Sequence, residues 1–154
     1  MCWRCDNPHS PIEDYLDELR AIIRDHGWAV QCVEDEKRPF AYTVGLHGPG
    51  APELLISGVS PQGASHVLNS VARGMIGEGT IVAPAMRIDC RDGPLIEVVE
   101  VEHPDVHLKF AIRLFGPRVR ALQLVWADER GRWPWDPSWR HGRRRQPVLG
   151  LRGR

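Results

Sequence analysis

Apolar residues recur at helical spacing near the start of the chain. In residues 12–23 the positions i, i+3, i+4, i+7, i+10 and i+11 are apolar, and most positions between them are charged. Because an α-helix turns once every 3.6 residues, this spacing places the apolar side chains on one stripe. Ser10 and Glu13 form a capping box around Pro11, and Gly27 supplies a stop. The pattern predicts a helix over residues 11–26, with its stripe made of Ile12, Tyr15, Leu16, Leu19, Ile22 and Ile23.

Shorter apolar runs, rich in β-branched and aromatic residues or alternating with polar ones, predict strands. They occupy residues 28–33, 40–46, 53–57, 86–90, 95–102 and 119–126. A second amphipathic helix is expected from Pro61 to about Met75, after the N-cap residue Ser60. Residues 105–115 fit a strand or a helix, and Gly116 favours a helix stop.

This order of elements predicts an α+β fold. Strands clustered between helices favour a mostly antiparallel sheet of about five to seven strands with two or three helices. No internal repeat or low-complexity linker divides the 154 residues, and a chain of this length can bury a core without disulfides. We therefore expect residues 1–154 to form a single compact domain.

Composition and the lack of targeting patterns indicate the cellular compartment. Hydrophobic residues make up 42% of the chain and charged residues 26%, as in soluble globular proteins. The N-terminus lacks a signal-peptide pattern, and no apolar run approaches the ~20 residues that cross a bilayer. We expect a cytoplasmic protein without a membrane partner. In that compartment its four cysteines would be thiols, metal ligands or redox groups rather than disulfides.

The charges are segregated along the chain, although the formal net charge is zero. Residues 1–128 hold 12 Lys and Arg against 18 Asp and Glu, a net charge of −6. Residues 129–154 hold eight Arg against two acidic residues, a net charge of +6. A basic tail of this kind either pairs with its own acidic body or binds an anionic partner. The sequence leaves both possibilities open.

Two cysteines and a histidine crowd the N-terminus in the pattern C-x2-C-x3-H. Cys2, Cys5 and His9 all lie within residues 1–9, directly before the expected helix. Thiolates and imidazole suit Zn²⁺, and this spacing lets both thiolates face one ion. We therefore predict that Cys2, Cys5 and His9 bind zinc. The alternatives are a redox-active cysteine pair and a frayed terminus in which the cysteines have no role.

A closed tetrahedral zinc site needs a fourth ligand. The candidates are Cys32, Cys90, His26 and His47 from the body of the fold, and Asp6 within the segment itself. A ligand from the body would clamp the N-terminus onto the fold and couple metal binding to local folding. An open fourth position would instead allow catalysis or metal exchange.

Several blocks of sequence together resemble a family of small, mainly bacterial proteins catalogued as domain of unknown function 4262. The blocks lie at residues 1–5, 26–31, 40–46, 52–54, 68–69, 121–128, 131–135 and 146–150. The resemblance implies one domain in a cytoplasmic setting, and it implies no activity.

The loop region from Tyr42 to Glu53 joins a strand to a turn rich in glycine and proline. Backbone amides in such a loop can approach a phosphate, and flavin-binding split barrels share this order of elements. No G-x-G-x-x-G or P-loop pattern occurs. The region is either a hairpin turn, with Glu53 solvated or paired with an arginine, or a flavin or nucleotide site. A hydrolase is disfavoured because Cys32 and Cys90 lie in strand patterns and no G-x-S-x-G motif occurs.

Residues 133–154 form a C-terminal arm rich in tryptophan and arginine. Aromatic rings stack on unpaired bases and guanidinium groups neutralise phosphates, as in RNA-binding segments. We expect Trp133 and Trp135 to pack on the sheet instead, with arginines stacked on them. Arg143, Arg144 and Arg145 are then the residues left for a partner. No motif for sequence-specific DNA binding occurs, and the oligomeric state is not indicated.

These patterns together predict a small accessory or regulatory protein. Its Cys/His cluster would bind zinc or respond to zinc or thiol state, and it would act through a protein or ribonucleoprotein partner such as the ribosome. The alternative is an enzyme that binds flavin or a nucleotide in the region from Tyr42 to Glu53. Whether the chain is an enzyme is not decided by its sequence.

Overall fold

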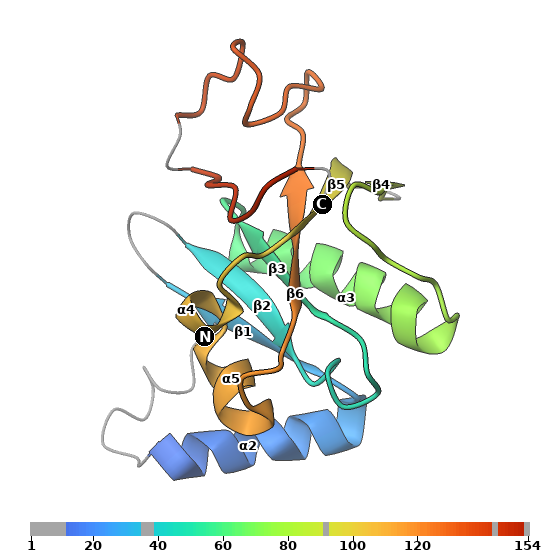
Figure 1. Ribbon diagram of the computed structural model, residues 1–154, viewed down its shortest axis with the longest axis vertical. Helices are drawn as coiled ribbons and strands as arrows, with labels where there is room; N and C mark the ends of the chain where they lie inside the picture. Colours follow the sequence, from blue (N-terminus) through green and yellow to red (C-terminus); the bar gives the residue numbers. More distant parts are fainter. Residues whose placement is uncertain (1–11, 35–38, 91–92, 143–144, 153–154) are drawn as a thin grey trace.

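A six-stranded sheet in the order β1-β2-β3-β6-β5-β4 forms the centre of the fold (Figure 1). The structure, a computed structural model, describes residues 12–34, 39–90, 93–142 and 145–152. All neighbouring strands are antiparallel except the central pair β3–β6, which is parallel. The predicted α+β fold with a mostly antiparallel sheet is confirmed. The strands are β1 (Ala29–Val33), β2 (Phe40–Val44), β3 (Glu53–Ser57), β4 (Arg87–Asp89), β5 (Leu95–Glu100) and β6 (Ala121–Trp126).

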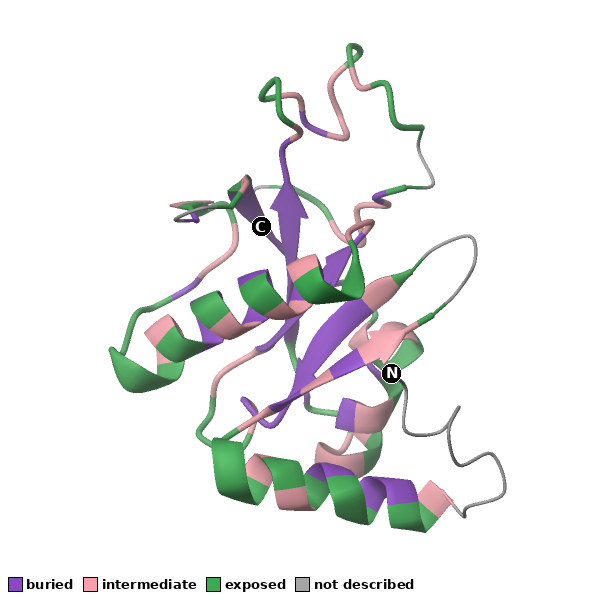
Figure 2. Ribbon diagram, turned by 180° about the vertical axis from the view of Figure 1, so that it is seen from behind, coloured by how far each residue is buried: buried purple, intermediate pink, exposed green. Residues whose placement is uncertain are grey.

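Helices cover both faces of the sheet (Figures 1 and 2). Helix α3 (Pro61–Gly77) packs on one face, where Leu54, Ile56 and Leu68 are fully buried. Ser60 caps it as predicted, because its hydroxyl oxygen accepts from the Gly63 amide at 3.1 Å. Burying each such apolar side chain stabilises the fold by about 1.5–3 kcal/mol. The opposite face is covered by α2 (Ile12–His26), α4 (Pro104–His107) and α5 (Lys109–Phe115).

The segment that fitted either a strand or a helix forms the two short helices α4 and α5. Leu108 and Ala111 lie three residues apart and are both fully buried against β2 and β3. The Tyr42 hydroxyl accepts from the Phe110 amide at 3.1 Å, which fixes the start of α5. Gly116 follows the last helical residue with a φ of 92°, as the expected stop requires.

The C-terminal arm is part of the fold. After β6 the chain forms a protruding loop and then returns across the end of the sheet (Figure 1). The buried Gln146 side chain accepts from the Trp126 amide at 2.8 Å and donates to its carbonyl at 2.9 Å. Gln123 accepts from the Leu149 amide at 2.7 Å. Two side-chain amides therefore satisfy backbone groups that would otherwise be buried without partners. No helix within the described ranges is long and apolar enough to cross a membrane.

Candidate functional site

The predicted zinc ligands Cys2, Cys5 and His9 lie outside the described residues, and so does Asp6. Across residues 12–34, 39–90, 93–142 and 145–152, no three His, Cys, Asp or Glu side chains are grouped so as to hold a metal ion. What the structure does locate are the four candidates for a ligand from the body.

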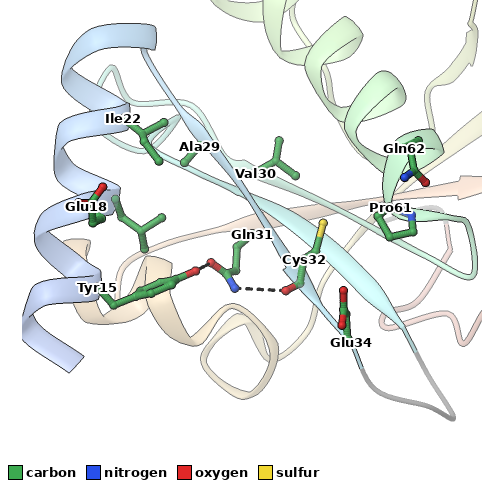
Figure 3. A pocket seen from close by; sticks show the side chains of 11 residues that line it. Tyr15, Glu18, Ile22, Ala29, Val30, Gln31, Cys32, Glu34, Pro61 and Gln62 are labelled. Carbon is green, nitrogen blue, oxygen red and sulfur yellow. Dashed lines mark hydrogen bonds between the residues drawn. The ribbon is translucent and has the colours of Figure 1, made fainter. Parts of the chain in front are cut away.

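A groove of about 480 Å³ follows the edge strand β1 (Figure 3). One wall is the side of α2 that carries Tyr15, Glu18 and Ile22. The other wall is the start of α3, at Pro61 and Gln62. The floor is β1 itself. Because β1 ends the sheet and only β2 pairs with it among the described strands, the groove opens along an exposed strand edge.

A hydrogen-bond chain fixes the start of α2 beside the end of β1. The Tyr15 hydroxyl donates to the Gln31 side-chain oxygen, and the Gln31 side-chain nitrogen donates to the Cys32 carbonyl at 3.2 Å (Figure 3). Helix and strand run in opposite directions, joined at Gly27, which has a φ of 95°. The chain before Ile12 therefore joins the fold at the same end as Cys32.

Among the four candidates for a fourth zinc ligand from the body of the fold, Cys32 has the most suitable position. It is half-buried, and its sulfur lies in the groove facing Pro61 and Gln62 (Figure 3). Cys90 is buried in the core under α3, and this burial raises the pKa of its thiol. His26 sits at the far end of α2, about 20 Å along the helix axis from Ile12. His47 lies in the β2–β3 connection, with its ring 5.6 Å from that of Phe115.

Glu53 is fully buried, which corrects the expectation of a solvated or arginine-paired carboxylate. It accepts from the Thr43 hydroxyl at 2.9 Å and from the amides of Gly45 at 2.9 Å, Leu46 at 3.0 Å and His47 at 3.3 Å. Burial raises the pKa of Glu53, and the four hydrogen bonds oppose that shift. The amides of Gly45, Leu46 and His47 therefore already have an acceptor and are not available to a phosphate.

Trp133 and Trp135 pack on the protein, as predicted. Their two rings stack on each other, and each ring also contacts the guanidinium group of one arginine. Their rings are 5.2 Å apart and nearly parallel, at 6°. The Arg152 guanidinium lies 3.7 Å from the Trp135 ring, and the Arg87 guanidinium lies 4.9 Å from the Trp133 ring. Both arginines bind the buried Glu97, at 2.7 Å and 3.2 Å. The hydrogen bond from Arg152 lowers the pKa of Glu97. The sequence pattern indicated the two tryptophans but not Glu97.

Arg145 is the one predicted partner-binding arginine that lies among the described residues; Arg143 and Arg144 lie outside them. Its Nε atom donates to the Gly58 carbonyl at 3.3 Å, and its guanidinium lies 5.6 Å from the Trp126 ring. Gly58 has a φ of 80°, and a Cβ atom there would come within 2.3 Å of the Arg145 carbonyl oxygen. The Arg145 side chain therefore contacts Gly58 and Trp126 while it remains exposed on the surface.

The model of one protein family matches residues 22–140, and its description reads domain of unknown function (DUF4262). The matched range contains Cys32 and residues 127–140 of the protruding loop after β6. It excludes residues 1–5 and 146–150, two of the blocks on which the resemblance was based. No curated protein and no solved structure gives a significant match to the chain.

Proposed function

The chain belongs to the DUF4262 family, and we propose that it is a small accessory or regulatory protein that binds zinc through Cys2, Cys5, His9 and Cys32. The observation that supports this proposal is the position of Cys32. Its sulfur lies in a groove at the end of the fold where the N-terminal segment joins α2. Extended chain spans at most about 3.6 Å per residue, so the seven steps from Ile12 back to Cys5 cover up to about 25 Å. Cys5 can therefore lie up to about 25 Å from Ile12, and Cys2 is three residues further along the segment.

Three thiolates and one imidazole form a closed tetrahedral site of the structural type. Because the ligands must be deprotonated and come together only when the segment is ordered, metal affinity couples to local folding. Zinc would hold the segment against the groove, and loss of zinc or oxidation of the thiols would expose that surface. A protein or ribonucleoprotein partner would distinguish the zinc-bound state from the zinc-free or oxidised state. The cytoplasm, which keeps thiols reduced, is the compartment that suits such a site.

Elemental analysis of anaerobically purified protein tests the proposal. We expect about one zinc per chain in the wild type, and a large loss of zinc in Cys2→Ser/Cys5→Ser and in Cys32→Ser. Cys90→Ser is the matched control, because Cys90 follows β4 at the opposite edge of the sheet from β1, and it should retain zinc. Urea unfolding of each variant shows whether the fold has survived.

The outcomes separate the parts of the proposal. If the wild-type protein contains no zinc, the proposed metal site is refuted as a whole. Zinc retained in Cys32→Ser but lost in Cys2→Ser/Cys5→Ser would keep the cluster and remove Cys32 from it. A yellow preparation with flavin absorbance would instead support the alternative cofactor in the region from Tyr42 to Glu53.

A further inference from the structure

A second hollow, of about 760 Å³, lies beyond the ends of the two parallel strands. β3 ends at Ser57 and β6 ends at Trp126, and their carboxyl ends share one edge of the sheet. Crevices at the carboxyl ends of parallel strands are the usual ligand sites of open sheets. The walls come from segments far apart in sequence and include Val59, Leu95, Asp128 and Arg145.

Asp128 fixes the wall of the hollow that is formed by the loop after β6. Its side chain is 5% exposed, and its carboxylate accepts from the amides of Arg130 at 3.0 Å and Arg132 at 2.9 Å. It also binds the Arg132 guanidinium at 2.8 Å and lies 3.2 Å from His141 Nε2. Burial acts to raise the pKa of Asp128, but the hydrogen bonds from Arg132 and Arg130 outweigh it and bring the pKa to about 2. The carboxylate is therefore ionised at neutral pH and fixes both the turn and the imidazole.

Apart from Asp128 and its partner Arg132, the side chains that line the hollow include basic and aromatic groups. The charge of Arg132 neutralises that of Asp128. Among the remaining charged residues of the hollow, Arg130 and Arg145 are positive and Glu129 is negative, so the net charge of these three is positive. In the part of the chain that the structure describes, neither Arg130 nor Arg145 forms an ion pair. The His141 ring lies 4.6 Å from the Trp139 ring and 6.4 Å from the Trp126 ring. The hollow that Arg130 and Arg145 line is therefore also lined by packed aromatic rings.

We propose that this hollow binds the phosphate group of a nucleotide, either free or within single-stranded RNA. Guanidinium groups match the geometry of phosphate oxygens, and a ring beside them offers a face on which a base can stack. Arg130 and Arg145 bind the phosphate, and His141, backed by Trp139, lies next to the base. This site uses none of the residues of the proposed zinc site, so each proposal can fail without the other.

NMR titration of the full-length protein tests the site, with AMP, adenosine and an adenylate RNA hexamer as separate probes. We expect AMP, the hexamer or both to shift the Trp126 and Trp139 indole signals, and adenosine to bind at least about tenfold more weakly because it lacks phosphate. Arg130→Gln should weaken binding about tenfold. Glu129→Gln should tighten it about twofold, because it removes a like charge.

Arg113→Gln is the matched control, since Arg113 is exposed on α5 and lines neither hollow. Binding of AMP alone identifies a free nucleotide as the ligand. Binding of the hexamer alone, with affinity falling steeply with salt, identifies RNA. The proposal is overturned if no probe binds, if adenosine binds as tightly as AMP, or if Arg113→Gln weakens binding as much as Arg130→Gln.

Discussion

The buried carboxylate of Glu53 should be among the most sensitive single positions in the fold. Replacing Glu53 by Gln keeps the size of the side chain and changes one acceptor oxygen into a donor NH2 group. The remaining oxygen can still accept from the Thr43 hydroxyl and the Leu46 amide. The amides of Gly45 and His47, which now donate to the other oxygen at 2.9 and 3.3 Å, would face a second donor.

The expected loss follows from those two amides. A buried N–H group left without an acceptor costs about 1–3 kcal/mol, and the His47 amide, which is only partly buried, falls at the low end of that range. The substitution also removes a buried charge, which burial disfavours, and this offsets part of the loss. Without that offset the two amides would cost about 2–4 kcal/mol, so the free energy of unfolding should fall by about 1–3 kcal/mol. That is a large share of the about 5–15 kcal/mol typical of a domain.

Urea unfolding followed by tryptophan fluorescence measures this loss. With a slope of about 2 kcal/mol per molar urea, the midpoint should move down by about 0.5–1.5 M. Glu102→Gln is the matched control, because the same change at that exposed side chain should shift the midpoint by less than about 0.3 M. If Glu53→Gln stays as close to the wild type as the control does, the four hydrogen bonds do not stabilise the loop as argued.

The attachment of the C-terminal arm gives further predictions. Glu97→Gln should lower the free energy of unfolding by about 1–2 kcal/mol in urea at neutral pH, because three charge-assisted hydrogen bonds weaken while both arginines keep contact with water. Folding lowers the pKa of Glu97 from 4.5, so its contribution is present above that pH and is lost as the pH falls through the folded-state pKa. The wild type should therefore lose more stability than Glu97→Gln between about pH 6 and about pH 3, and parallel pH profiles would contradict this. Gly150→Ala would place a Cβ atom 1.8 Å from the Glu100 carbonyl oxygen, so it should cost about 1–3 kcal/mol and speed hydrogen exchange at the Glu102 amide, which donates to Leu149. Gly77→Ala, whose Cβ atom would meet nothing within 4 Å, should not destabilise the protein.

The elements predicted best are those set by local pattern. Helix α2 was predicted because a capping signal, an apolar stripe and a glycine stop agree, and its buried residues Tyr15, Leu16 and Leu19 all lie on that stripe. The segment before Gly116 stayed undecided because Phe110, Ile112 and Leu114 alternate as in a strand. Tertiary contacts decide it, since Ala111, one residue after Phe110, is buried against β2 and β3.

The two buried glutamates show where sequence patterns stop being informative. Glu53 is the first residue of β3, and nothing near it in sequence reveals that three amides of the preceding loop turn toward it. Glu97 shares one face of β5 with Val99, a pattern that fits a solvent-facing strand as well as a buried one. Its burial depends on Trp133 and Arg152, which return from more than 30 residues further along the chain.

Four arginines of the basic segment 129–154 fall into two groups, which explains why the charge of that segment fitted two hypotheses. Arg132 and Arg152 bind Asp128 and Glu97 inside the fold. Arg145 and the neighbouring Arg130 line the hollow after β6 and pair with no carboxylate among the described residues. The first group fixes the arm and so determines where the second group points. Substitutions in the first group should therefore lower stability and binding together, whereas Arg130→Gln should lower binding while leaving the unfolding midpoint nearly unchanged.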